Sequence, residues 1–347
     1  MLNRFRPVLT CAVWLTATAA MAQGAPPPTQ AGASANTVAP VIVQASPFPR
    51  SETVKRSRSF VRTYAAPTAH LEQVARWRGS VCVLVLGLVP EQAAQVARRI
   101  EDVAKAVGLR VDRSGCKANI EIVFSDQPQA VLDWVADRSD WVLGYHYASQ
   151  TQAVKTVTRP IQPWYMTATQ GFGGDNGAMA FAAIGNDAGA RGLSFTKPTE
   201  LVDAPNNGTP SGCAGSKFTS CLRTVFKNVL VVVDNGRVRN QPLGPVTDYL
   251  AMLTLSQPSS LDGCLPLTSV IDLFAPAACP GRPAPDGLTG ADAAYLTALY
   301  ASNPEAKTAA QQSEIAHRMA RILANATPVA QKVETGADTS ASHADGH

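Results

Sequence analysis

The stretch SVCVLVLGLVPEQAAQVARRIEDVAKAVGL, residues 80–109, decides the fold. Its first nine residues, 80–88, form a continuous run rich in Val and Leu, which is typical of a strand buried on both faces of a sheet. The residues after Pro90 have apolar side chains at helical spacing, and Gly108 supplies a helix stop. The apolar stripe of this predicted helix consists of Val96, Ile100, Val103 and Val107.

A second apolar run, ANIEIVF at residues 118–124, predicts another strand soon after that helix. Strand, helix and strand within this short length form a βαβ unit, whose two strands are parallel and joined by a right-handed crossover. If the two strands are neighbours, Cys82 near the start of the first can approach Cys116, which lies just before the second.

The remaining pattern turns to β and then to helices. A short helix is predicted within 125–137, with Pro128 in its first turn. Strands are predicted at 152–158, 162–169 and 226–238. Helices are predicted at 244–257, 288–304 and 313–325, and Thr289 with Asp292 forms a capping-box pattern at the start of the second. We therefore expect an α+β fold, with a mixed sheet built on the βαβ unit and helices at the C-terminal end.

The N-terminal residues predict export. MLNRFRP supplies two arginines, an apolar run at 8–20 follows, and the small residues of AMAQ predict cleavage after Ala22. Residues 23–50 are rich in Ala, Pro, Gln and Ser, which is typical of a disordered linker, and 326–347 form a similar tail. The prediction is a signal peptide at 1–22, a single domain at 51–325, and a periplasmic or secreted location. No later apolar run reaches about 18 residues, so an integral membrane protein is not expected.

Six cysteines remain once the leader, which contains Cys11, is removed. An even number in an oxidising compartment favours disulfides, and no C-x-x-C pair points to zinc. Four of the six cysteines can form two pairs of near neighbours in sequence, each of which closes a loop rich in small residues and proline. The two cysteines of the βαβ unit then remain to pair with each other. The predicted bridges are Cys213 with Cys221, Cys264 with Cys279, and Cys82 with Cys116.

Charge argues against nucleic acid as a partner. The formal net charge is +4, and loss of Arg4 and Arg6 with the leader lowers it to +2. One local excess lies at residues 51–78, where six Lys or Arg side chains accompany two Glu. A solvated face is the favoured interpretation of this stretch, and contact with an anionic surface such as the outer membrane's inner face is the alternative.

The order of predicted elements resembles the metzincin-like zinc peptidase fold. The resemblance rests on a βαβ unit, an edge hairpin, the helix GPVTDYLAMLTLSQ at 244–257, a turn at 268–279, and a helix that begins Leu-Thr-x-x-Asp. In that family the helix at this place carries H-E-x-x-H, in which two histidines one turn apart bind zinc and the glutamate acts as general base.

This sequence keeps none of those zinc ligands. The family pattern places Thr247 and Ala251 at the two histidine positions, Asp248 at the glutamate and Gln257 near the third ligand. Residues 268–279, at the place of the Met-turn, contain no methionine. The resemblance thus implies a non-catalytic protein of zincin-like derivation without a metal or cofactor. A plain core helix is the alternative, since its apolar residues follow helical spacing unaided.

Two further candidate sites come from the residues themselves. His146, between two tyrosines, could serve a metal-independent hydrolase with Ser149 or Ser194, although no G-x-S-x-G elbow is present. Trp164 and Tyr165 lie on a predicted edge strand, where a peptide could add beside the sheet if these side chains are not core residues. We therefore expect a ligand cleft with Trp164, Tyr165 and His146 as candidates, and a peptide or cell-envelope ligand.

Overall fold

The computed structural model describes most of the chain after the predicted linker. The described residues are 46–68, 71–112, 115–170, 222–262, 264–275 and 279–326, and they belong to one compact unit. The predicted cleavage site at Ala22, the cysteines Cys213 and Cys221, and Ser194 lie outside these ranges.

The centre of the molecule is a four-stranded mixed sheet with the strand order β1-β2-β4-β3. Its strands are β1 (Val83–Leu86), β2 (Ile120–Ser125), β3 (Ile161–Gln170) and β4 (Arg223–Asp234). β1, β2 and β4 run parallel, and β3 pairs antiparallel with β4 along one edge. The predicted α+β class and the parallel βαβ unit are confirmed.

Helices cover both faces of this sheet, and three of them follow directly from a strand. They are α1 (Arg50–Tyr64), α2 (Pro90–Ala106), α3 (Pro128–Ser139), α4 (Thr151–Val154), α5 (Asn235–Val238), α6 (Leu243–Leu255), α7 (Gly290–Ala301) and α8 (Thr308–Asn325), with 3-10 turns η1 (Asp140–Leu143), η2 (Ala148–Gln150) and η3 (Val270–Phe274). The predicted capping box is present at α7, where Thr289 and Asp292 bond reciprocally.

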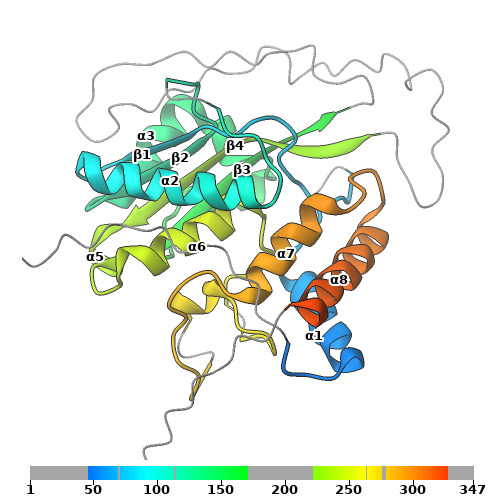
Figure 1. Cartoon of the computed structure of the whole chain (residues 1–347). Coiled ribbons are helices and arrows are strands. Elements are labelled where there is room, and N and C mark those ends of the chain that lie inside the picture. Colours follow the sequence, from blue (N-terminus) through cyan, green and yellow to red (C-terminus); the bar gives the residue numbers. More distant parts are fainter. Residues whose placement is uncertain are drawn as a thin grey trace, which may run out of the picture. The chain divides into compact units, whose positions relative to one another are not determined.

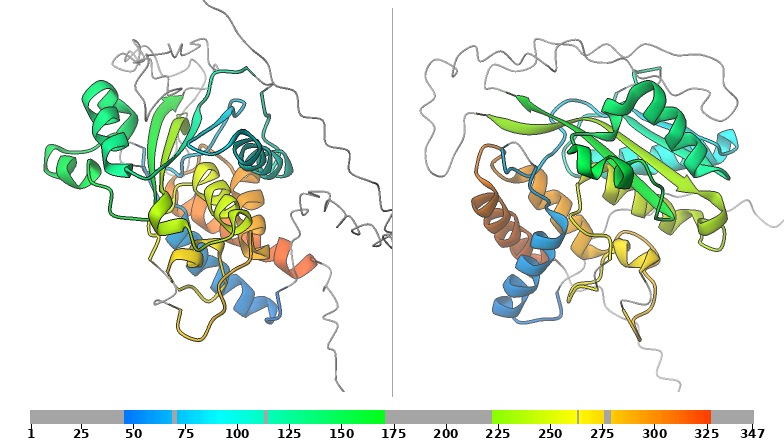
Figure 2. Two further views of the ribbon diagram at one scale, coloured as in Figure 1. Left: turned by 90° about the vertical axis from the view of Figure 1, so that its left-hand side faces the viewer. Right: turned by 180° about the vertical axis from the view of Figure 1, so that it is seen from behind.

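The two faces of the sheet are covered by different helices. α2 and α6 lie against one face, together with the larger apolar core, and α3 covers the other (Figures 1 and 2). The predicted stripe of α2 is largely confirmed, because Val96, Ile100 and Val103 are buried at this core. The helix predicted at 244–257 is therefore an inner helix of the larger core.

Two strand predictions need correction. β1 was expected to be buried on both faces, but its four residues are only half-buried because β1 lies at an edge of the sheet. Residues 152–158 were expected to form a strand, but they contain the end of α4 and a turn instead. Both errors concern position in the sheet, which the local sequence does not determine.

The basic stretch at 51–78 contains a helix that its sequence pattern did not predict. α1 spans 15 residues, buries Phe60, Val61 and Tyr64 on one side, and packs against α8. The segment before α1 also contacts α8, because the Ser46 backbone N–H donates to the Leu323 carbonyl over 3.0 Å. α1 and α8 thus lie side by side, and their buried side chains belong to the larger apolar core (Figure 2).

Two disulfides hold the described part of the chain. Cys82 pairs with Cys116 beside the βαβ unit, and Cys264 pairs with Cys279 in the segment before α7. Both bridges were predicted, and they are consistent with an extracytoplasmic location. Within the described residues, no helix has the length and apolar character needed to span a membrane.

Peptide mapping without reduction should recover these two bridges from exported protein, together with the predicted pair Cys213–Cys221. The Cys264–Cys279 bridge closes a separation of 15 residues. A loop of this size is expected to contribute roughly 3 kcal/mol by restricting the unfolded chain. Labelling of several of these thiols in native exported protein would contradict the assignment.

Candidate functional site

The candidate site on α6 is filled by protein. Thr247 is 2% exposed and donates its Oγ1 hydrogen to the Leu243 carbonyl one turn earlier, over 2.7 Å. Ala251 is fully buried, one turn further along the same helix. In an active zincin-like site these two positions would face a zinc ion and its water. Here both side chains face packed protein.

Asp248, at the place of the family's glutamate, serves as a structural tie. The guanidinium of Arg99 on α2 donates to both of its oxygens, at 2.6 and 3.1 Å. The Leu288 backbone N–H donates to Oδ2 over 2.7 Å. A Cβ atom at Gly287 would lie 2.7 Å from the same oxygen, so a larger residue there would have to displace this carboxylate. The carboxylate therefore links α2, α6 and the segment before α7. Because its oxygens already accept these hydrogen bonds, it is not available as a general base.

The C-terminal end of α6 is closed by aromatic side chains from three distant segments. The last carbonyls of a helix have no partner within it. Tyr165 on β3 donates to the Leu253 carbonyl, Trp77 to that of Thr254, and Tyr300 on α7 to that of Leu255, at 2.8 to 3.0 Å. We call these three side chains the aromatic cap.

Gln257, near the third ligand position, lies just beyond this cap. Its carbonyl accepts a hydrogen bond from the Ala66 backbone N–H at 3.1 Å. Its side-chain Oε1 is buried without a hydrogen-bond partner. The backbone of Gln257 thus ties the end of α6 to the segment after α1.

A buried carboxylate network joins Ser269 and Val270 to the start of α7. Asp292 of α7 is fully buried, and its oxygens accept hydrogen bonds from Ser269 Oγ at 2.6 Å and the Val270 N–H at 2.8 Å. The N–H and Oγ1 of Thr289 donate to it as well. Burial raises the pKa of Asp292 to about 6, against the lowering effect of these donors. The network fixes the turn against the start of α7.

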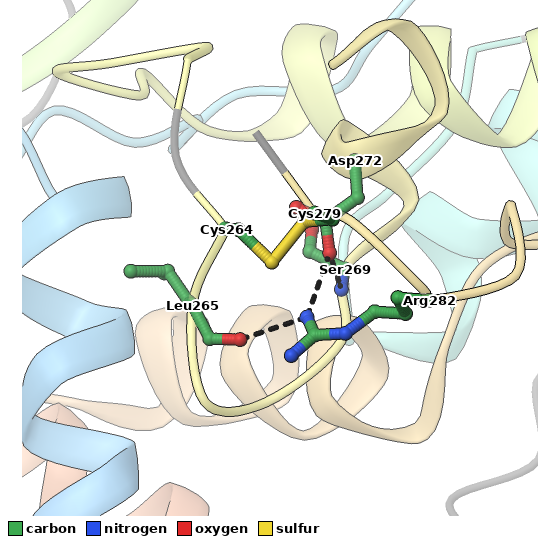
Figure 3. The surroundings of a disulfide bond; sticks show 6 residues. All are labelled: Cys264, Leu265, Ser269, Asp272, Cys279 and Arg282. Atoms are coloured by element: carbon green, nitrogen blue, oxygen red, sulfur yellow. Dashed lines mark hydrogen bonds and ion pairs between the residues drawn. A yellow bond between two sulfur atoms is a disulfide. The ribbon is translucent and has the colours of Figure 1, made fainter. Parts of the chain in front are cut away.

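The second disulfide lies beside this network. Figure 3 shows the Cys264–Cys279 bridge next to Ser269, Asp272 and Arg282. Arg282 Nη1 donates to the Leu265 carbonyl over 2.8 Å and contacts Asp272 at 3.4 Å. Burial raises the pKa of Asp272 above its usual value. These contacts are structural, since each polar group faces the protein interior or the loop itself.

The candidate cleft residues do not meet on one surface. Trp164 is 4% exposed, packs in the core on the α3 face, and donates Nε1–H to the Val154 carbonyl at 2.9 Å. Tyr165 points to the opposite face, toward α6. His146 lies outside both cores and donates Nδ1–H to the Gly144 carbonyl over 2.9 Å. Trp164 therefore stabilises the core instead of lining a groove.

The edge strand itself is partly blocked as a place for an added peptide strand. Pro163 has no N–H to donate to a peptide. Gly144 has a φ of 79°, and a Cβ atom there would lie 2.2 Å from the Tyr165 carbonyl oxygen. The turn before His146 thus packs directly against the backbone of β3, which reduces the open edge.

The comparisons with protein-family models, curated proteins and solved structures give no match.

His146 has exposed neighbours, and in the part of the chain that the structure describes no serine is bonded to it. Among the described residues it makes one hydrogen bond, to a carbonyl, and none joins it to Ser149. Its neighbours Tyr145 and Tyr147 are 59% and 60% exposed, with ring centroids 5.4 Å apart. The two exposed rings form an aromatic surface patch. Among the described residues, His146 has no acid–base partner.

Sequence reasoning missed a buried polar pair on the α3 face of the sheet. Glu121 of β2 and Asn228 of β4 are fully buried, and their side-chain N and O atoms have no hydrogen-bond partner among the described residues. Register places Glu121 opposite Leu230, two residues from Asn228. Burial raises the pKa of Glu121 well above its usual value, which favours the neutral acid. The signal was present, because Glu121 interrupts the apolar run ANIEIVF.

Proposed function

We propose that the chain is an exported, non-catalytic domain of zincin-like derivation, a pseudo-metallopeptidase that binds a component of the cell envelope. The observation that carries the proposal is the filled site on α6. Thr247 and Ala251 are enclosed, and Asp248 is held by Arg99 and the Leu288 N–H. A peptidase would need an open, solvated metal position on this helix.

The arrangement of elements supports the zincin-like part of the proposal. The β1–α2–β2 unit is parallel, β3 is an antiparallel edge strand, and α6 follows β4 and shares a face of the sheet with α2. A turn and α7, with its Leu-Thr-x-x-Asp start, come next. From β1 to α7, the observed order agrees with the predicted one except at 152–158, where α4 replaces an expected strand.

Purified mature protein should contain no stoichiometric zinc and should cleave no peptide. Thr247, Ala251 and Gln257 offer no imidazole, thiolate or carboxylate to the metal, and Asp248 already has three donors. Elemental analysis and a generic peptide substrate measure both expectations. One tightly held zinc per chain, or cleavage that Asp248→Asn abolishes, would overturn the non-catalytic reading.

The derivation has its own test in the triple variant Thr247→His, Ala251→His and Gln257→His. Two of these positions are buried, so the imidazoles should lower the Tm in the absence of metal. If the three positions still surround one point, zinc should raise the Tm of the triple variant and leave that of the single variant Thr247→His nearly unchanged. If the triple variant folds and zinc does not raise its Tm, the zincin-like derivation is refuted. That result would not affect the proposed absence of catalysis.

A further inference from the structure

One face of α1 is an exposed stripe of cations. Lys55, Arg58 and Arg62 follow one another at spacings of three and four residues, and all three are exposed. These spacings place them on the same side of a helix. The opposite side of α1 is buried against the core through Phe60 and Val61.

α8 extends this stripe across a second helix. α1 and α8 lie side by side (Figures 1 and 2). His317 and Arg321 are exposed one turn apart on α8, and Arg58 Nη2 lies 3.2 Å from His317 Nε2. Because this contact joins the two stripes, Lys55, Arg58, Arg62, His317 and Arg321 form one surface, which we call the basic face.

The carboxylates of both helices are already paired with other arginines. Glu52, the sole acid of α1, bonds to Arg56 at 2.9 Å, and Glu314, the sole acid of α8, bonds to Arg318 at 2.8 Å. Within the described ranges, the four Lys and Arg side chains of the basic face form no ion pair. Their charge is therefore available to an external anion.

A pocket adjoins the basic face where α8 meets α7. Its volume is about 430 Å³, and its lining includes Arg318, Arg321, Ile322 and Asn325. Alanines of α7 supply part of its apolar wall. Arg318 is bonded to Glu314 in this wall, so among the described residues Arg321 supplies the unpaired guanidinium beside apolar carbons, a combination that suits one phosphate carrying an acyl or glyceryl group.

We propose that the basic face binds an anionic lipid surface, with the pocket accepting one phosphate-bearing headgroup. A lipid surface presents many phosphates in a plane, which matches cations spread over two neighbouring helices, whereas a single carboxylate would neutralise one. None of the three exposed large apolar side chains among the described residues lies on α1 or α8. The contact is therefore peripheral and electrostatic. This inference rests on the proposed function and names its envelope ligand.

Sedimentation with lipid vesicles tests the proposal on the mature chain. The protein should bind vesicles that contain phosphatidylglycerol and ignore vesicles of phosphatidylcholine alone, and added salt should release it. The double variant Arg58→Glu with Arg321→Glu should bind at least about 25-fold more weakly, since each basic residue near an anionic surface contributes about a fivefold factor. The matched control is Arg98→Glu with Arg110→Glu, two exposed arginines away from this face, which should bind like the wild type.

The outcomes separate this proposal from the proposed function. Failure of the wild type to bind, or equal binding by the two double variants, would overturn the basic face as a lipid site and leave the zinc and peptidase tests unaffected. Salt-sensitive binding to polyglutamate without vesicle binding would also overturn it, in favour of an acidic protein partner. Circular dichroism checks the fold of each variant, and Arg58→Ala with Arg321→Ala replaces the reversal if the latter does not fold.

Discussion

Replacement of Trp164 by Ala is expected to lower the free energy of unfolding by about 3–5 kcal/mol. The indole is 4% exposed and packs on the α3 face among Val123, Leu132 and Leu230. Truncation would leave a cavity between the sheet and α3, and it would also remove the donor to the Val154 carbonyl. Urea unfolding measures the change.

Tyr145→Ala is the matched control for this prediction. Tyr145 is an aromatic residue that is 59% exposed, so its removal should change the stability by no more than about 0.5 kcal/mol. If Trp164→Ala unfolded at the same urea concentration as the wild type, Trp164 would have to be a surface residue. That result would restore the aromatic cleft as a candidate site.

Asp292→Ala is expected to lower the free energy of unfolding by about 4 kcal/mol, because it removes the acceptor that several buried donors share. Ser269 Oγ, the Val270 N–H and the Thr289 N–H would lose their partner together. The first turn of α7 would also lose its capping box. Urea unfolding again gives the size of the effect.

Asp286→Ala provides the control, since Asp286 is exposed and lies only six positions before Asp292. Its removal should change the stability by no more than about 0.5 kcal/mol. A loss of less than about 1 kcal/mol for Asp292→Ala would mean that the network makes no special contribution to the turn at 268–279.

Local patterns in the sequence predicted the parts of the fold that depend on neighbouring residues. The apolar stripe of α2, the parallel βαβ unit and the Thr289–Asp292 capping box were all predicted correctly. The edge position of β1 was not, because burial of a strand depends on which strands pair with it. The helix α1 was missed because its many charged residues obscured a narrow buried stripe.

The candidate site was harder to predict because its contacts join distant segments. Asp248 resembles a degenerate glutamate when α6 is considered alone, but Arg99, its partner, lies 149 positions away. Trp164 and Tyr165 are adjacent in sequence, and strand geometry places them on opposite faces of the sheet. Since both faces carry apolar cores, no local pattern indicated that both of these side chains would pack against protein.

The aromatic cap of α6 also has a consequence for the order of folding. Its three hydrogen bonds span sequence separations of 177, 88 and 45 residues. Contacts of such long range form slowly, because the loops between the partners must close first. Two of the partners, Trp77 and Tyr165, precede α6 in the chain, and Tyr300 follows Leu255 by 45 residues. The last turn of α6 can therefore reach its final state only after segments from both sides of it in the sequence have docked, which makes this helix end a late step of folding.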